Sequence, residues 1–569
     1  MRIANNVRLP AAAIMALASG GLLASDLVLT GGHIYTANPA RPFVQAVAVT
    51  GARIESVGDD GEVRRTAGHA TVIDLHGRTV LPGIVDSHVH LLYGAYALHG
   101  LNLSMPDSSL TPHDEEALVA RLRAYAAAHP ADKMIFARAD FGTVPPFAPT
   151  RELLDRAVAD RPVIVHNTSE HALWLNSRAL ELAHLTAAPV ADPDQERGII
   201  RDASGQPSGL LLEAAMAIAG RAANAAISTA EKLTWIRDAT RFLNRQGITS
   251  VVNATGDLEE IRLYATLRDR GQLTVRTRTS FGEVAVPHHL TPQFLADLEE
   301  ARRLYHDDWV SANLVKFFLD GGTGLLPPLV YRPAEYRSLV TELDRRGFQL
   351  MSHALRDDSV RLILDSYEAA LAANGPRERR WRIEHAQLIQ DADLPRFARL
   401  GVIADMQPAF CCGETGTNFD SVHPLVSDRW QSLAKSGAHL AFSSDWPCTW
   451  PPDPFVAMGQ AVTRRVWHSS DTADIPGGAL DGAGQGGAVA TQTVYEPQER
   501  VSVQAAVDAY TRGGAFAAAH DEQVGTLEPG KAADLIVLSQ DVFQVAPEEI
   551  GKTRVVATMV GGKVVYGSW

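Results

Sequence analysis

The stretch TVLPGIVDSHVHL, residues 79–91, decides the fold of this chain. Its apolar run ends in His88 and His90, and alternation along a strand places both imidazoles on one face. Two imidazoles about 6–7 Å apart on a strand can bind one metal ion, and imidazole suits zinc and its neighbours. Such a pair alone is often just polar surface. Here it ends an apolar strand, where barrel enzymes place their ligands, so we expect further ligands at other strand ends.

Seven more strand candidates recur along the chain, separated by amphipathic helical segments. They are residues 247–254, 273–281, 312–320, 347–354, 381–387, 401–408 and 438–445. With the first strand they make eight βα units, which predicts an α/β fold with a (β/α)8 TIM-type barrel at residues 80–524. Residues 92–244 separate the first strand from the second, and we expect them to form a large insertion.

The residue pattern at both ends of the chain differs from that of the middle. Residues 25–79 and 525–569 consist of short alternating runs broken by Gly-Gly, Thr-Gly and Pro-Gly turns. This pattern predicts a small β-sandwich domain that both termini build together, with the barrel inserted between its two halves.

Charge and apolar content limit the partners of the protein. The formal net charge is −14 over 569 residues, and the absence of a basic stripe argues against a nucleic-acid partner. Beyond the first 24 residues, no segment reaches the roughly 20 apolar residues that span a bilayer. We therefore expect a small-molecule substrate and no membrane span, and the composition allows a homo-oligomer.

The N-terminal segment has the pattern of a signal peptide. Arg2 and Arg8 precede an apolar stretch at residues 11–24, in which small residues around Ala16 and Ala18, or at Ala24, are candidate cleavage positions. Residues 1–24 are therefore predicted to direct the protein to the periplasm or outside the cell. The alternative is a disordered leader on a cytoplasmic enzyme.

Chemically reactive side chains stand at the ends of several predicted strands. These residues are Lys316 and Asp320 in the fourth strand, His353 in the fifth, Glu384 and His385 in the sixth, and Asp445 in the eighth. Because the carboxyl ends of barrel strands meet at one mouth, we expect these side chains to converge with the first two histidines. Twenty histidines are scattered along the chain, so this joint placement counts for more than any single one.

Such a cluster suits hydrolysis. A bound divalent ion lowers the pKa of water from about 16 to about 7, and a second ion about 3.5–4 Å away stabilises the tetrahedral oxyanion. Asp445 beside the resulting hydroxide can accept its proton and pass it to the leaving nitrogen. A plain helix-capping role is the alternative for this aspartate.

The motifs LPGIVDSHVH, VKFFLDGGTG, SHALRD, RIEHAQLI, SSDWP and GTLEPGKAADLIVL resemble the amidohydrolase superfamily. In particular they are similar to its amidohydrolase-3 (YtcJ-like) branch, which includes N-substituted formamide deformylases. The resemblance extends from about residue 26 to the end and includes HNTSEHALWLNSRAL, which is similar to a histidine-containing motif of that branch.

The resemblance implies a binuclear metal centre, most often of zinc, with six ligand residues: His88, His90, Lys316, His353, His385 and Asp445. The histidines of the first strand would bind the more buried ion, and those of the fifth and sixth strands the second ion. The lysine, carboxylated by carbon dioxide to a carbamate, would bridge both ions, and Asp445 would contact the first ion and act as the proton shuttle. The alternative is an unmodified Lys316 that pairs with Asp320.

Three further residues are candidates for substrate binding. The family's HAxGD motif reads HALRD at residues 353–357, so Arg356 brings a guanidinium that either favours a carboxylate-bearing substrate or points away. His171 either contacts the substrate or packs in the insertion. Trp446 either shapes the pocket wall or closes a turn.

The predicted activity is hydrolysis of an amide or other non-peptide C–N bond of the N-acyl or N-formyl amine type. A lactone, carboxylic ester or phosphoester is the alternative substrate, because an activated hydroxide attacks all of them. A non-catalytic binding protein on the same fold is a third reading, and it predicts a broken ligand set. All six ligand positions are filled.

Overall fold

The computed structural model of the protein describes residues 26–66, 68–103, 114–141, 149–282, 289–320, 329–413, 425–469 and 488–569. The predicted signal peptide at residues 1–24 lies outside these ranges. Among the described helices, none combines the length and the apolar character that crossing a bilayer requires.

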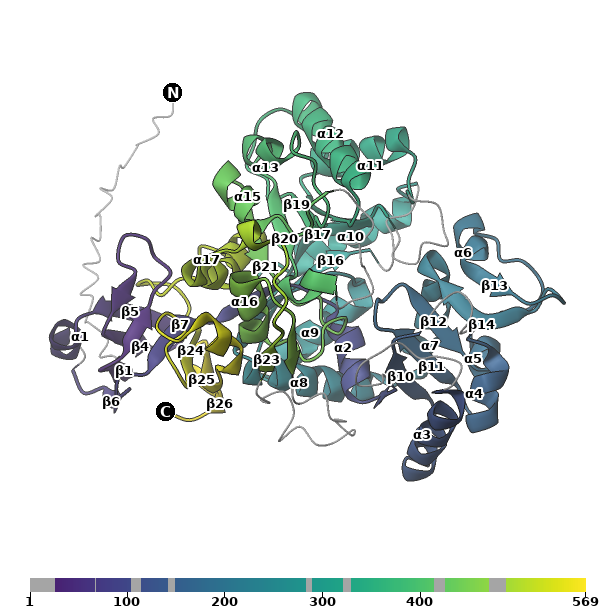
Figure 1. The fold of residues 1–569 in the computed structure, drawn as a ribbon, viewed down its shortest axis with the longest axis horizontal. Helices are drawn as coiled ribbons and strands as arrows, with labels where there is room; N and C mark the ends of the chain where they lie inside the picture. The colour runs from purple at the N-terminus through teal and green to yellow at the C-terminus, as the bar shows by residue number, and fades with distance from the viewer. Residues whose placement is uncertain are drawn as a thin grey trace, which may run out of the picture.

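An eight-stranded sheet of parallel strands occupies the centre of the molecule (Figure 1). Its strands, in order around the sheet, are β8 (Ile84–Val89), β15 (Ile248–Asn253), β16 (Arg276–Phe281), β17 (Val310–Phe318), β18 (Gln349–Ala354), β19 (Arg382–His385), β20 (Ile403–Met406) and β21 (His439–Phe442). All eight coincide with strands expected from the sequence, so the predicted α/β barrel is confirmed. Most of these strands are apolar and buried, as parallel strands covered on both faces usually are, but β16 (RTRTSF) is buried with mainly polar side chains.

The barrel closes between its last and first strands just beyond the end of β21. The Asp445 N–H donates to the carbonyl of His88 at 2.8 Å, and the His90 N–H donates to the carbonyl of Trp446 at 2.7 Å. Closure therefore takes place at the level of the predicted ligands and links the two segments that carry three of them.

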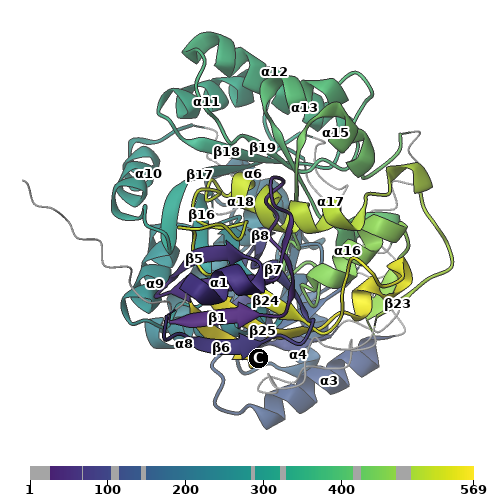
Figure 2. The ribbon, with the colours of Figure 1, turned by 90° about the vertical axis from the view of Figure 1, so that its left-hand side faces the viewer.

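Helices cover the outside of the barrel (Figures 1 and 2). They are α8 (Thr229–Arg245), α9 (Leu258–Asp269), α10 (Pro292–Leu304), α11 (Pro333–Arg345), α12 (Asp357–Asn374), α13 (Leu394–Leu400), α15 (Trp430–Ser436), α16 (Pro454–Thr463), α17 (Val503–Asp508) and α18 (Gly514–Ala517). Local sequence sets several of their starts. Ser228 and Glu231 form a capping box at α8, and proline opens α10, α11 and α16.

A second sheet forms between β8 and β15 and lies beside the barrel, on the right of Figure 1. Its strand order is β13 (Ile199–Arg201), β14 (Pro207–Leu212), β12 (Ala172–Leu175), β11 (Val163–Asn167), β10 (Ile135–Ala139) and β9 (Leu101–Asn102). The helices of this part are α2 (Leu91–Leu98), α3 (Glu115–Ala128), α4 (Arg151–Ala157), α5 (Ser177–Leu182), α6 (Pro193–Gly198) and α7 (Met216–Ala226). Separate apolar clusters pack on the two faces of the sheet.

Strands from both ends of the chain share one sheet on the opposite side of the barrel, in front in Figure 2. Its order is β26 (Lys563–Gly567), β25 (Val555–Val560), β24 (Leu535–Leu538), β7 (Thr79–Pro82), β2 (His33–Tyr35) and β3 (Phe43–Val44). Beside it lies a four-stranded sheet of β5 (Arg53–Gly58), β4 (Ala46–Thr50), β1 (Leu27–Thr30) and β6 (Thr71–Asp74), and one apolar cluster joins the two sheets. The exact limits of the terminal domain and of the insertion stay predictions.

The stretch at residues 79–91 thus contributes strands to two sheets. β7 pairs with β24 and β2, whereas β8 pairs with β15 in the barrel, and only Gly83 separates the two strands. A Cβ atom at Gly83 would lie 2.2 Å from the hydroxyl of Thr249. The chain passes from the terminal sheet into the barrel at a point where only glycine fits.

Candidate metal centre

The structure brings the six predicted ligand residues together at the carboxyl end of the barrel. They are His88 and His90 at the end of β8, Lys316 in β17, His353 in β18, His385 in β19 and Asp445 after β21. All six are buried, with at most 8% of any residue exposed. Parallel strands deliver their ends to one mouth, so residues up to 357 positions apart in the sequence become neighbours.

Asp445 lies at the centre of the cluster. Its Oδ1 atom is 3.3 Å from Nε2 of His88 and 3.2 Å from Nε2 of His90. Ligand-type atoms of His88, His385 and Asp445 all lie within 4.8 Å of one another. The ring of His385 is 5.2 Å from that of His88 and 4.5 Å from that of His353, so the six residues form one continuous group.

Each histidine is held through Nδ1 by a side chain near another strand end. The pairs are His88 with Glu384 at 2.5 Å, His90 with Thr255 at 2.9 Å, His353 with Asp320 at 2.8 Å, and His385 with Gln407 at 2.7 Å. Such partners fix the orientation of a ligating imidazole and leave Nε2 as its free ligand atom. The pattern is that of a metal site in which four rings are oriented in advance.

Glu384 is itself anchored. Arg382 donates to both of its carboxylate oxygens, at 2.8 and 2.7 Å, and pairs with Asp405 at 2.9 Å. All three side chains are fully buried. Burial raises the pKa of Glu384 to about 7, against the opposing effect of Arg382.

Burial also sets the charge of the ligand atoms. It holds the pKa of His88, His353 and His385 well below the ordinary 6.5, so these imidazoles are neutral at pH 7. Burial alone would raise the pKa of Asp445, but His90, His385 and Lys316 outweigh it and keep that pKa below its ordinary 3.8. Neutral imidazoles and an ionised carboxylate are the protonation states that bind a metal ion.

The residues present fit a divalent cation. Oδ1 of Asp445 is buried and makes no hydrogen bond within the described residues, although two imidazole Nε2 atoms face it. A buried carboxylate oxygen without a donor is costly unless a cation satisfies it. Nitrogen and carboxylate ligands of this kind suit zinc and neighbouring metals.

Lys316 lies inside this cluster, and no described carboxylate forms an ion pair with it. Its Nζ is 3.3 Å from Nε2 of His88 and 4.3 Å from the centre of the Phe318 ring. Burial lowers the pKa of this amine to about 8. Asp320 instead accepts from Nδ1 of His353 and from the backbone N–H groups of Leu355 and Arg356, so the alternative pairing of Lys316 with Asp320 is wrong.

Two residues of the centre adopt a left-handed backbone. The φ angles of His385 and Asp445 are 66° and 56°. Such conformations cost about 1–3 kcal/mol each in a non-glycine residue and persist where the surrounding structure holds them. Here the closing hydrogen bonds of the barrel and the ring partners supply that constraint.

His171 reaches the cluster from the second sheet. Its Nδ1 lies 2.9 Å from Oε2 of Glu213, and its ring centre is 5.5 Å from that of His353. Burial lowers the pKa of His171, but Glu213 and other carboxylates outweigh burial and raise it above the ordinary 6.5. The structure therefore adds this predicted residue to the wall of the centre.

Arg356 and Trp446 lie outside the cluster. The Arg356 guanidinium pairs with Asp358 at 2.9 and 2.7 Å, and 43% of its side chain is exposed. Trp446 is fully buried, against Gly94 and the rings of Phe242 and Trp450. Trp446 therefore supports the closing turn from behind, and a substrate contact by either residue stays a prediction.

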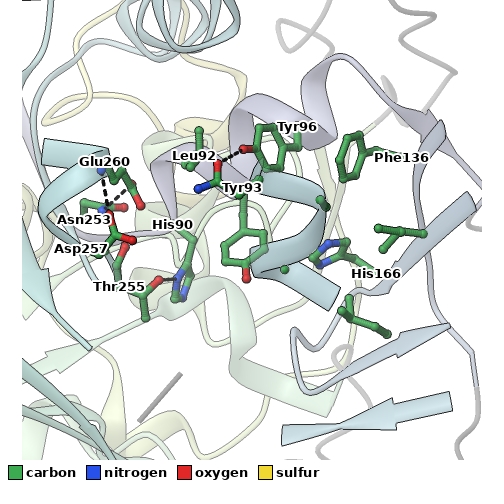
Figure 3. A pocket seen from close by; sticks show the side chains of 16 residues that line it. His90, Leu92, Tyr93, Tyr96, Phe136, His166, Asn253, Thr255, Asp257 and Glu260 are labelled. Carbon is green, nitrogen blue, oxygen red and sulfur yellow. Dashed lines mark hydrogen bonds between the residues drawn. The ribbon is translucent and has the colours of Figure 1, made fainter. Parts of the chain in front are cut away.

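A pocket adjoins the centre at His90 and extends between the barrel mouth and the second sheet (Figure 3). Its lining is mostly apolar or aromatic on the side of the second sheet and polar on the side of the barrel. The lining residues include Tyr93, Tyr96, Phe136, Ile164, His166 and Leu173 on the first side, and Asn253, Thr255 and Asp257 on the second.

Sequence reasoning missed two of the side chains that orient the histidines. Thr255 follows β15 and Gln407 follows β20, so both stand directly after barrel strands. The signal that identified the ligands, the identity of the residues that end each strand, was also present at these positions. Threonine and glutamine are common there, however, and only the three-dimensional structure shows which histidine each one contacts.

The fold and this cluster together define a (β/α)8 barrel of the metal-dependent hydrolase class. The chain belongs to the amidohydrolase family, whose model matches residues 71–566. It is 28% identical to the LONG AFTER FAR-RED 3 protein of Arabidopsis thaliana, over 96% of this chain and 92% of that protein. It is 26% identical to the N-substituted formamide deformylase of Arthrobacter pascens, over 95% of this chain and 98% of that enzyme. A solved structure, an uncharacterized metal-dependent hydrolase from Pyrococcus furiosus, superposes with a TM-score of 0.66 at 25% identity, over 91% of this chain and all of that one.

Proposed function

We propose that this protein hydrolyses an amide or other non-peptide C–N bond in a small N-acyl or N-formyl amine. The observation that carries the proposal is the buried Oδ1 atom of Asp445, which faces two imidazoles inside a hydrolase-type barrel and accepts no hydrogen bond from any described residue. The similarity to a formamide deformylase over nearly the whole chain supports this bond type.

We assign His88, His90 and Asp445 to one zinc-like ion, and His353 and His385 to a second. The two groups lie at opposite ends of the chain of ring contacts that runs through the cluster. Lys316 would bridge them as a carbamate. Its amine is buried, has a pKa of about 8 and pairs with no acid among the described residues, so its lone pair is available to attack carbon dioxide. That reaction joins nitrogen to carbon and releases one proton.

A bound divalent ion would lower the pKa of water and polarise the scissile carbonyl. Asp445 would accept a proton at its carboxylate and return it to the leaving nitrogen, and its lowered pKa beside His90, which keeps it ionised at neutral pH, supports this role. His171, held by Glu213, would bind the substrate from the side of the second sheet. The four oriented histidines keep the ligand atoms in place during turnover.

Two measurements test this function. Metal analysis of the purified protein should find one to two equivalents of zinc or a similar ion. A screen of N-formyl amines, N-acyl amines and carbamates, beside lactones and aryl phosphates, should show turnover of the C–N compounds. Turnover of lactones or phosphates alone would contradict the bond type, and a protein that binds no metal even with bicarbonate present would contradict the site.

The Asp445→Asn variant tests the proton shuttle. It should retain metal through the histidines but lose turnover by a factor of about 10²–10⁴, the usual contribution of a positioned acid–base group. The control is Asp391→Asn, because Asp391 is exposed. Asn253→Asp would be unsuitable because Asn253 lines the pocket. Wild-type turnover in Asp445→Asn would remove the aspartate from the reaction.

A further inference from the structure

Arg138 in β10 carries a buried guanidinium that no described side chain pairs with. Only 8% of the residue is exposed, and within the described residues its side chain forms no hydrogen bond and no ion pair. Its guanidinium lies over the ring of Trp450, whose centre is 5.0 Å from the guanidinium carbon. Burial lowers the pKa of this arginine, and Glu170 is the carboxylate that most opposes the shift.

Strand geometry places Arg138 on the pocket side of the second sheet. Side chains two residues apart share a face of a strand, so Arg138 lies on the same face as Phe136. Its register partner on β11 is His166. Phe136 and His166 both line the pocket and face His90 across it in Figure 3. The intervening Ala137 packs in the cluster on the opposite face.

Aromatic rings on two sides lie between Arg138 and the metal centre. The Trp450 ring beneath its guanidinium is 5.9 Å from the ring of Trp446, and the carbonyl of Trp446 accepts from the His90 N–H. On the sheet side, His166 is 5.1 Å from Tyr93, and Tyr93 is 6.3 Å from His90. On one side ring contacts, and on the other the neighbouring strand position of His166, thus lead from Arg138 to one ligand residue.

An unpaired buried charge is expensive, and although Glu170 and Asp140 act on this one through space, no described carboxylate forms an ion pair with it. A cation–π contact recovers only about 0.5–2 kcal/mol of a desolvation cost of several kcal/mol. Glu170 is paired with His166 at 3.3 Å and does not approach Arg138 within ion-pair distance. A planar guanidinium in this position matches a carboxylate, which it binds through two parallel hydrogen bonds.

We propose that Arg138 binds a carboxylate of the substrate, so that the preferred amides carry a carboxylate near the scissile bond and an apolar group in the adjoining pocket. The proposal deepens the proposed hydrolase function and rests on it for the identity of the bond. It moves carboxylate recognition from Arg356, whose guanidinium Asp358 already neutralises, to a residue of the second sheet.

The kinetic test compares two compounds that differ only in the carboxylate, N-formylphenylalanine and N-formylphenethylamine. Hydrogen bonds to a charged group contribute about 1.5–3 kcal/mol, so the wild-type protein should favour the acid about 10- to 100-fold in kcat/KM. Arg138→Met should reduce that preference to near one, mainly through KM. Arg178→Met, which removes an exposed arginine of the same part of the chain, should keep the wild-type preference.

Thermal unfolding separates substrate recognition from a structural role. Because Arg138→Met removes an unpaired charge, its Tm should equal or exceed that of the wild type, whereas loss of a structural arginine would lower it. A lowered Tm with an unchanged substrate preference would overturn the proposal. N-formylphenylalanine should raise the Tm of the slowly reacting Asp445→Asn protein but not that of the Arg138→Met/Asp445→Asn double variant.

These outcomes distinguish the proposal from the function on which it rests. If both compounds are hydrolysed equally and Arg138→Met leaves their ratio unchanged, carboxylate recognition fails while the hydrolase function stands. If neither compound is hydrolysed but the acid stabilises the protein only when Arg138 is present, the N-formyl function fails while the recognition site stands.

Discussion

Replacing Gly94 by alanine should distort the closing turn of the barrel. Gly94 lies in α2, and a Cβ atom there would be 2.0 Å from Cζ3 of Trp446 and 2.3 Å from two further atoms of the same ring. Carbon atoms in contact normally stay about 3.5–4.0 Å apart. The fully buried indole would have to move by more than about 1 Å against Phe242 and Trp450.

The net cost is the difference between two opposing effects. Overpacking of a buried site costs about 1–3 kcal/mol, and three ring atoms within 2.3 Å put this site at the upper end. Alanine in place of glycine inside a helix returns about 0.5–1 kcal/mol. We therefore expect Gly94→Ala to lower the free energy of unfolding by about 2 kcal/mol.

Urea unfolding and metal analysis check this prediction. The carbonyl of Trp446 accepts from the His90 N–H, so a displaced ring should also lower metal content and turnover. Gly61→Ala in the exposed helix α1 (Asp60–Thr66) is the matched control, because a Cβ there would meet no atom within 4 Å and should leave stability unchanged or slightly raised. A Gly94→Ala protein as stable as Gly61→Ala would refute the packing argument.

Two further predictions concern the ligand residues. Glu384→Gln should weaken zinc binding about 10- to 100-fold, because His88 loses its carboxylate partner at Nδ1, and competition with a chelator measures this. The exposed Glu378→Gln is its control, and equal affinity in the two variants would contradict the role of Glu384. For Lys316, a pKa of about 8 means that the reactive neutral amine rises from roughly a tenth of the population at pH 7 to roughly nine-tenths at pH 9. Reactivation of metal-free protein at constant dissolved carbon dioxide should therefore be roughly tenfold faster at pH 9, and a flat pH profile would argue against the carbamate.

The barrel and its cluster were predictable because their signals are local. Most buried parallel strands are apolar along their length, and each of the eight runs, including the more polar β16, is long enough to be recognised in one dimension. Once the strands are parallel, their carboxyl ends meet, so the residues that end them become neighbours without any knowledge of the loops. His353 and Asp445 could be placed in one site for this reason.

Contacts that depend on the exact course of a loop were not predictable. Arg356 was a candidate for substrate recognition because of its sequence neighbours, but the start of α12 places its guanidinium against Asp358. No sequence motif surrounds Arg138. Its proposed role follows from the lack of an acidic partner for its guanidinium among the described residues. The left-handed φ of Asp445 is likewise set by barrel closure rather than by the sequence near it.

The candidate ligands and the candidate recognition residues lie in different parts of the chain. This separation has a consequence for substrate selectivity. Every candidate ligand ends a barrel strand, whereas His171 and Arg138 belong to the second sheet, which meets the centre across the pocket at His90. Substitutions in the second sheet can therefore change the groups that face the substrate without moving a ligand. If the barrel supplies the hydrolytic groups and this sheet the recognition groups, Arg138→Met should change the ranking of substrates while metal content stays that of the wild type. A variant that lost metal as well would show that recognition and metal binding are coupled through Trp450 and Trp446.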